Sequence, residues 1–226
     1  MKLQFIVATR ASLDDFYLKT ATGKSLALYQ SSELSVHVFP ENKVGLSSIY
    51  NSAIERFANE QCILVFAHDD LHITDFYWMH SVFNGLQHFG VVGCAGNVGR
   101  VSLQPSWGFK NLDFEWDLPH NLSGIVGHGK QFPPEGLAVF GPPFRQVKLL
   151  DGLFLAAFSE TLKNSNLRFD ERFDFHFYDM DFCRQAEQLG VSMGTIPLSL
   201  VHESGGEYGS ESWMQGYKKY IEKWSS

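Results

Sequence analysis

Short apolar runs alternate with segments of helical periodicity along much of this chain. Three runs rich in β-branched and aromatic residues, each short enough to be a buried strand, lie at 3–8 (LQFIVA), 34–39 (LSVHVF) and 62–67 (CILVFA). Between the second and third, the segment 45–60 repeats apolar residues with the period of a helix, and Ser47 or Ser48 is its expected N-cap. Strands that alternate with helices predict a parallel α/β sheet.

The same alternation continues after residue 73, with one interruption. A second helix is expected from a cap at Thr74 to a stop at Gly90, followed by a strand-like run, VVGCAG. The region 97–146 is rich in Gly and Pro and is expected to be irregular but ordered. Later elements are an apolar run at 149–158, a helix ending at Gly190, a strand at 191–203 and a helix at 211–224. No repeat or linker divides the chain, so we expect a single domain, 1–226.

The composition is that of a folded protein. Of 226 residues 44% are hydrophobic and 19% charged, which predicts a packed core rather than disorder. The net charge of −7 argues against nucleic acid as the main partner. Three widely spaced cysteines without a CxxC pattern indicate reduced thiols. No apolar run reaches the roughly 20 residues of a transmembrane helix, so a cytoplasmic location is expected.

Two histidines and two acids follow the third strand-like run. They are His68, Asp69, Asp70 and His72, in the stretch ILVFAHDDLHI. Ligands of parallel sheets bind beyond the carboxyl ends of the strands, and carboxylate and imidazole groups are ligands for Mn²⁺ or Mg²⁺. On an extended chain Asp70 and His72 point to the same side, as do His68 and Asp70. The structural alternative is an acid pair that only caps a helix or forms a turn.

Three further polar clusters each have a structural interpretation as well as a chemical one. Asp151 precedes Gly152, as in an ordinary Asp-Gly turn. Asp179 and Asp181 crowd the start of a predicted helix, where acids are favoured by the helix dipole. His202 lies at a strand end before a glycine pair and is by default a structural histidine.

Taken in order, these segments resemble the family-2-type glycosyltransferases with a GT-A fold, in particular a compact cytoplasmic branch. The matching segments are SSIYNSAIERFANEQCILVFAHDD, VVGCAG, LLDGLFLAAF, LRFDERFDFHFYDMDFCRQAEQLG and LVHESGG. They extend from about residue 34 to the end and leave 97–146 unmatched. The resemblance implies a Rossmann-like GT-A domain with a mixed, mostly parallel sheet flanked by helices. The unmatched region is then a candidate flap on the acceptor side.

The resemblance also implies roles for individual residues. Those assigned to a divalent metal, Mn²⁺ or Mg²⁺, are Asp70, His72 and His202. Those assigned to the nucleotide-sugar are Glu41, Asn42, Asn51, Asp69 and Asp151. Asp179 falls at the catalytic acid of the family's ED motif. Two positions depart from the pattern, because Ala67 stands where the first acid of a DxD motif lies and Tyr178 replaces the Glu of ED.

The activity that the resemblance implies is metal-assisted and inverting: transfer of a sugar from a nucleotide-diphosphate sugar to a hydroxyl acceptor, as in polysaccharide biosynthesis. The atypical AHDD and the missing Glu leave a second hypothesis open, a non-catalytic GT-A domain that binds a nucleotide-sugar or glycan. A nucleotidyltransferase is the third hypothesis. Against it, the N-terminal VATRASLDD lacks a Gly-rich phosphate loop with a following Lys.

Overall fold

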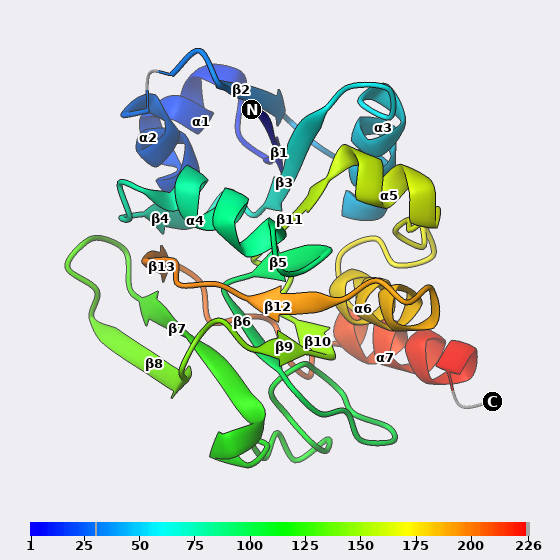
Figure 1. Ribbon diagram of the computed structural model, residues 1–226. Helices are drawn as coiled ribbons and strands as arrows, with labels where there is room; N and C mark the ends of the chain where they lie inside the picture. The colour runs from blue at the N-terminus through cyan, green and yellow to red at the C-terminus, as the bar shows by residue number, and fades with distance from the viewer. Residues whose placement is uncertain (30, 225–226) are drawn as a thin grey trace.

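A seven-stranded sheet runs through the centre of the computed structural model, which describes residues 1–29 and 31–224 (Figure 1). Its strand order is β2-β1-β3-β11-β5-β12-β9. The bounds are β1 Lys2–Ala8, β2 Leu34–Phe39, β3 Cys62–Ala67, β5 Val91–Gly93, β9 Gln146–Val147, β11 Phe154–Phe158 and β12 Met193–Thr195. Only β11 and β9 run against the other five, so the expected mixed, mostly parallel α/β sheet is confirmed.

Helices cover both faces of this sheet because alternate residues of its central strands are apolar on both sides. The bounds are α1 Leu13–Lys19, α2 Ala21–Ala27, α3 Leu46–Arg56, α4 Trp78–Leu86, α5 Ser159–Ser165, α6 Tyr178–Gln188 and α7 Glu211–Trp224. On one face Phe5 and Phe154 meet Trp78 of α4, with ring centroids 5.9 and 6.1 Å from the indole. On the other, Phe66 packs against Tyr50 of α3 at 4.8 Å.

A second sheet lies beside the first and is formed by strands that continue from it. Its order is β10-β6-β7-β13-β4, and β8 pairs with β7. The bounds are β4 Leu71–Ile73, β6 Ala95–Asn97, β7 Leu122–His128, β8 Gly136–Gly141, β10 Leu149–Leu150 and β13 Leu200–His202, with a short helix η1 at Pro119–Asn121. The chain passes from the first sheet to the second between β3 and β4, between β5 and β6, between β9 and β10, and between β12 and β13.

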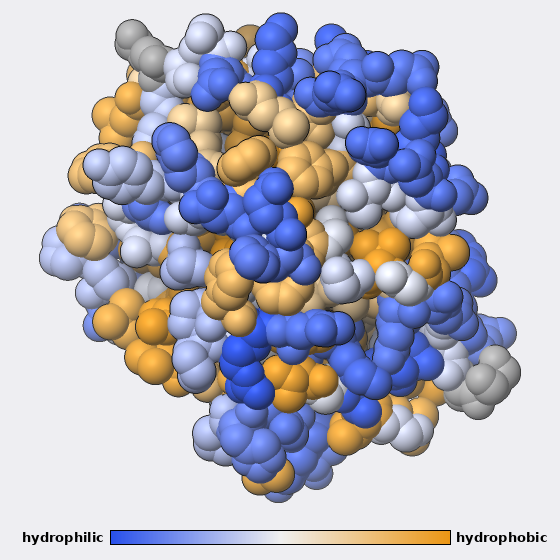
Figure 2. All heavy atoms as spheres, in the orientation of Figure 1, coloured by the Kyte–Doolittle hydropathy of each residue, from blue (hydrophilic) through white to orange (hydrophobic). Residues whose placement is uncertain are grey.

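The β7–β8 pair lies within the region that the sequence predicts to be irregular. The region 97–146 is rich in Gly and Pro, yet Leu122–His128 and Gly136–Gly141 pair antiparallel there. Figure 2 shows apolar side chains over β8, where Leu137 and Val139 are 65% and 67% exposed. A half-buried strand is expected to alternate apolar and polar residues, and apolar residues that face solvent break this alternation. For this reason the sequence did not predict β8.

Helix starts also differ from the expectation. Neither serine caps α3, whose N-cap is Gly45, because Ser47 is buried and donates to the Phe173 carbonyl instead. Helix α4 begins at Trp78 rather than beside Thr74, whose hydroxyl donates to the Ser199 carbonyl. In both places a hydrogen bond to a distant segment competes with local capping.

Helix α7 holds α6 in place through a buried acid. Asp181 is buried and lies 2.6 Å from the Lys223 ammonium. The Trp224 indole donates to the same carboxylate at 2.8 Å. Asp181 is therefore a structural residue, because its bonds to Lys223 and Trp224 hold the first turn of α6 against α7. No helix within 1–29 and 31–224 is long and apolar enough to span a bilayer.

The aromatic cluster of Phe5, Phe154 and Trp78 should contribute strongly to the free energy of unfolding. Phe154 is fully buried between Phe5 and Trp78, so Phe154→Ala should lower the free energy of unfolding by about 3–5 kcal/mol, because it leaves a cavity. The matched control is Phe76→Ala, since Phe76 is 79% exposed and its loss should cost less than about 0.5 kcal/mol. Urea denaturation of both variants measures the difference, and equal losses would contradict this packing.

Candidate functional site

The antiparallel pairing of β11 with β3 brings two polar segments to one edge of the central sheet. Phe154, the first residue of β11, is the register partner of Ala67, the last residue of β3. The residues before β11 therefore lie beside those after β3. A hydrogen bond of 3.1 Å from the His68 amide to the Leu153 carbonyl extends this pairing by one step.

Three side chains converge at this edge, and their ligand atoms all lie within 4.8 Å of one another. They are His68, Asp70 and His202. His202 Nε2 is 3.1 Å from Asp70 Oδ2, and His68 Nδ1 is 3.9 Å from Asp70 Oδ1. His202 reaches the site because β13 pairs antiparallel with β4, placing His202 opposite Leu71.

The electrostatics of this cluster suit a metal ion. Burial acts to raise the pKa of Asp70, but the hydrogen bond and charge of His202, with His68 nearby, lower it to about 2. Burial lowers the pKa of His68 despite the charge of Asp70, which favours the neutral, metal-binding imidazole. Burial also opposes charge on His202, yet its contact with Asp70 leaves its pKa raised. The Asp70 anion therefore faces an imidazole whose charged form it stabilises, which is a setting that favours a cation.

One atom of this cluster lacks a partner. Among the described residues, Asp70 Oδ1 is a buried carboxylate oxygen with no hydrogen-bond partner. Leaving such an atom unpaired costs free energy, whereas a bound cation would satisfy it. A carboxylate and two imidazoles are also an appropriate donor set for a divalent transition ion. The residues present therefore fit the metal that the resemblance implies.

Two further acids lie next to the cluster. Asp151 precedes β11, and its Oδ1 accepts from the Leu153 amide at 3.0 Å. Asp179, in the first turn of α6, accepts from the amides of Gly152 and Met180 at 3.0 and 2.8 Å. Burial raises the pKa of Asp151. Burial, together with the charge of Asp151, raises the pKa of Asp179 to about 7, so desolvation outweighs the helix dipole there.

A second polar group forms where β1, β2 and β3 end side by side. The Thr9 hydroxyl donates to Asp69 Oδ2 at 2.6 Å. The amides of Asn42 and Glu41 donate to the carbonyls of Thr9 and Ala11, which ties the turn after β2 to the end of β1. Three of the residues expected at a nucleotide, Glu41, Asn42 and Asp69, are thus brought to one edge.

Two of the expected site residues lie elsewhere. His72 is not in the metal cluster, because the chain bends after Asp70 and His72 belongs to β4 of the second sheet. Its Nε2 lies 3.0 Å from Glu203 Oε1. Asn51 is buried in α3, and its amide group bonds the backbone of Phe169 through both its nitrogen and its oxygen. These bonds give Asn51 a structural role, in holding the backbone of Phe169.

Two residues at this site carry weaker signals in the sequence. On an extended chain His68 and His72 both point to the same side as Asp70, so alternation does not choose between them, and only the family's Asp-x-His spacing implied His72. Tyr178 stands out in the sequence only as the replacement for a Glu, yet its hydroxyl lies 2.9 Å from His68 Nε2. A bend at Asp69 and Asp70 cannot be read from residue types alone.

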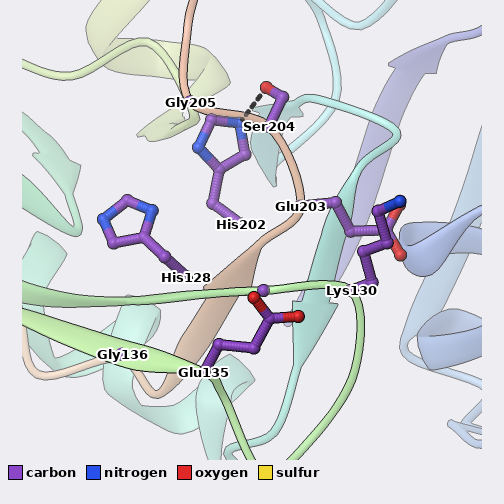
Figure 3. Close-up of a pocket in the computed structure, with 9 residues that line it drawn as sticks. His128, Lys130, Glu135, Gly136, His202, Glu203, Ser204 and Gly205 are labelled. Carbon is purple, nitrogen blue, oxygen red and sulfur yellow. Dashed lines mark hydrogen bonds between the residues drawn. The ribbon is translucent and has the colours of Figure 1, made fainter.

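A cavity of about 480 Å³ opens beside His202. It lies between the end of the β7–β8 pair and the loop after β13, and its lining includes His128, Lys130, Glu135 and Ser204 (Figure 3). His128 is the register partner of His202 on the neighbouring strand, and the Ser204 hydroxyl lies 3.0 Å from His202 Nε2. The region 97–146 therefore contributes directly to the surroundings of the site. Trp107, by contrast, is buried against Trp116 and Phe140.

A scan of protein-family models and a search of curated proteins find no match to this chain. Solved structures do match. GalNAc-T7 with UDP, GalNAc and Mn²⁺ aligns with a TM-score of 0.55 and 10% identity over 99% of this chain and 48% of that one. The mannosyltransferase PcManGT from Pyrobaculum calidifontis, in complex with GDP-Man and Mn²⁺, aligns with a TM-score of 0.50 and 13% identity over 97% and 59%.

This chain has a GT-A-like glycosyltransferase fold. The fold expected from the sequence is therefore confirmed. The chain spans only about half the length of these two neighbours, and identities this low show the fold alone.

The assignment of Asn51 as a structural residue can be checked by substitution. Asn51→Ala should lower the free energy of unfolding by about 2–4 kcal/mol, because it leaves the buried amide and carbonyl of Phe169 unpaired. Asn42→Ala is the control, since the Asn42 side chain bonds only Val44 within its own turn. Thermal and urea melts compare the two, and an unaltered stability of Asn51→Ala would contradict the assignment.

Proposed function

We propose that this protein is a metal-dependent glycosyltransferase that moves a sugar from a nucleotide-diphosphate sugar to a hydroxyl acceptor with inversion. The observation that carries the proposal is the unpaired Asp70 oxygen between two imidazoles, at the sheet edge where Asp151 and Asp179 also lie. The GT-A-like fold supports it, as do the nucleotides and Mn²⁺ named for the two neighbours.

In this proposal the residues divide into a donor side and an acceptor side. Asp69, Glu41 and Asn42 bind the nucleoside at the ends of β1, β2 and β3. A divalent cation, Mn²⁺ or Mg²⁺, held by His68, Asp70 and His202 supplies positive charge that stabilises the departing diphosphate. The position of Asp151 between the cluster and Asp179 suits it to hold sugar hydroxyls.

Asp179 is the proposed general base. An acceptor hydroxyl is a poor nucleophile until a carboxylate takes its proton, and a base works best when its pKa lies near the working pH. Burial holds the pKa of Asp179 at about 7, in that range. The amides of Gly152 and Met180 fix both carboxylate oxygens, and each oxygen keeps a further lone pair for the acceptor.

A non-catalytic domain that binds nucleotide-sugar or glycan is the second candidate. The anchoring of both Asp179 oxygens to backbone amides favours it, because the same bonds would stabilise a purely structural carboxylate. Both candidates require ligand binding, and only the first requires turnover.

Metal and nucleotide should stabilise the protein together. With Mn²⁺ present, a nucleotide-sugar at 100 times its dissociation constant should add about 2.7 kcal/mol to the free energy of unfolding. A thermal-shift screen of UDP- and GDP-sugars with and without Mn²⁺ measures this, with Asp70→Asn as the variant that should lose the metal-dependent shift. If no nucleotide shifts the wild-type melting temperature, the glycosyltransferase and the nucleotide-sugar-binding form of the second candidate both fail, and only a glycan-binding domain is left.

Removing the base should separate binding from turnover. Asp179→Asn should lower the transfer rate about 100- to 10,000-fold while the donor binds as before. In the wild type the rate should fall as the pH drops below about 7, because a proton then occupies the base. Steady-state assays at several pH values measure both effects, with Asp14→Asn, an exposed acid in the first turn of α1, as the control. Wild-type turnover by Asp179→Asn would refute this role for Asp179.

A further inference from the structure

The hydrogen bonds around Tyr178 determine which nitrogen of His68 carries the proton. The Tyr178 hydroxyl lies 2.8 Å from the Gly152 carbonyl oxygen and 2.9 Å from His68 Nε2. A carbonyl oxygen can only accept, so the single phenolic proton lies between Tyr178 and Gly152. The phenolic oxygen then accepts a hydrogen bond, and His68 Nε2 must donate it.

This assignment leaves a lone pair on the other ring nitrogen. A neutral imidazole with a proton on Nε2 has its lone pair on Nδ1. His68 Nδ1 is the atom that faces Asp70 Oδ1, at 3.9 Å, and Asp70 Oδ1 is the unpaired oxygen of the cluster. The lone pair of His68 Nδ1 and the unpaired oxygen of Asp70 are therefore both available to one ion bound between them.

We propose that Tyr178 is a positioning residue that holds His68 in the Nε2-protonated tautomer, so that His68 Nδ1 is the third protein ligand of the metal in place of His72. The inference rests on the metal site of the proposed function. Tyr178, which replaces the expected Glu, thereby has a defined role. The acceptor that binds the second ring nitrogen of a metal-bound histidine fixes the tautomer and the orientation of that ring.

The backbone at Gly152 supports this arrangement. A Cβ at residue 152 would collide with the Tyr178 hydroxyl, so only glycine allows the close approach of the phenol to the carbonyl. The Gly152 amide also donates to Asp179 Oδ2 at 3.0 Å. One peptide segment thus positions both the tyrosine beside the metal cluster and the proposed base.

The first test compares metal binding by single variants. Titration of Mn²⁺ followed by electron paramagnetic resonance should show that Tyr178→Phe binds about 10- to 100-fold more weakly than the wild type. Tyr29→Phe is the matched control, since the Tyr29 hydroxyl also donates to a backbone carbonyl, that of Asp75 at 3.1 Å, rather than bonding a proposed metal ligand. Equal affinities of Tyr178→Phe and the wild type would overturn the inference.

A double-variant cycle separates positioning from a general structural effect. If Tyr178 acts through His68, adding Tyr178→Phe to His68→Gln should cause no further loss of Mn²⁺ affinity. Additive losses would overturn the positioning role. Should Tyr178→Phe fail to fold, as seen by circular dichroism, His68→Gln and His72→Gln decide the ligand, because only the first should weaken Mn²⁺ binding.

Spectroscopy of the bound ion gives a readout independent of affinity. Electron spin echo modulation should detect two imidazole nitrogens on Mn²⁺ in the wild type and in His72→Gln, and one in His68→Gln. The opposite pattern would assign the site to His72 and refute the inference. A wild type that binds no Mn²⁺ at all would instead remove the metal from the proposed function, so the two failures are distinguishable.

Discussion

The reversed direction of β11 is the constraint on which the candidate site depends. If β11 ran parallel to β3, the segment before it would lie at the opposite edge of the sheet, away from Asp70. Because it runs antiparallel, with Phe154 opposite Ala67, the turn at Asp151 and Gly152 lies against the end of β3. Gly152 then contacts both Tyr178 and Asp179, so this single pairing connects the metal cluster to the start of α6.

The second sheet supplies the remaining proposed ligand of the metal. His202 comes from β13, which pairs with β4, the strand that follows Asp70 after a bend. The same bend turns His72 towards Glu203. This one change of direction therefore places the distant His202 in the cluster and the nearby His72 outside it. Neither result follows from spacing along the chain.

The sequence was informative wherever local pattern determines structure. The runs at 3–8 and 62–67 became β1 and β3, because buried strands of a parallel sheet are continuously apolar, and the alternating run at 34–39 became the half-buried edge strand β2. Asp70, His202, Asp151 and Asp179 were selected from strand and helix ends, and the structure brings all four to one region. Sequence pattern missed β8, whose apolar residues face solvent, and it did not reveal that the Asn51 amide holds the backbone of Phe169. The exposure of β8 and the hydrogen bonds of Asn51 both depend on tertiary contacts, which the local periodicity of a sequence does not reveal.

The acids of the site differ in their proton affinity, and that difference is what separates their proposed roles. Asp70 faces two imidazoles, and His202 lowers its pKa to about 2, so it remains an anion that can attract a cation. Asp179 has no cationic partner of this kind, and burial beside Asp151 raises its pKa to about 7. A carboxylate that holds a metal must resist protonation, whereas one that takes a proton must accept it readily. Two aspartates at the same sheet edge meet these opposite requirements because imidazoles surround only the first.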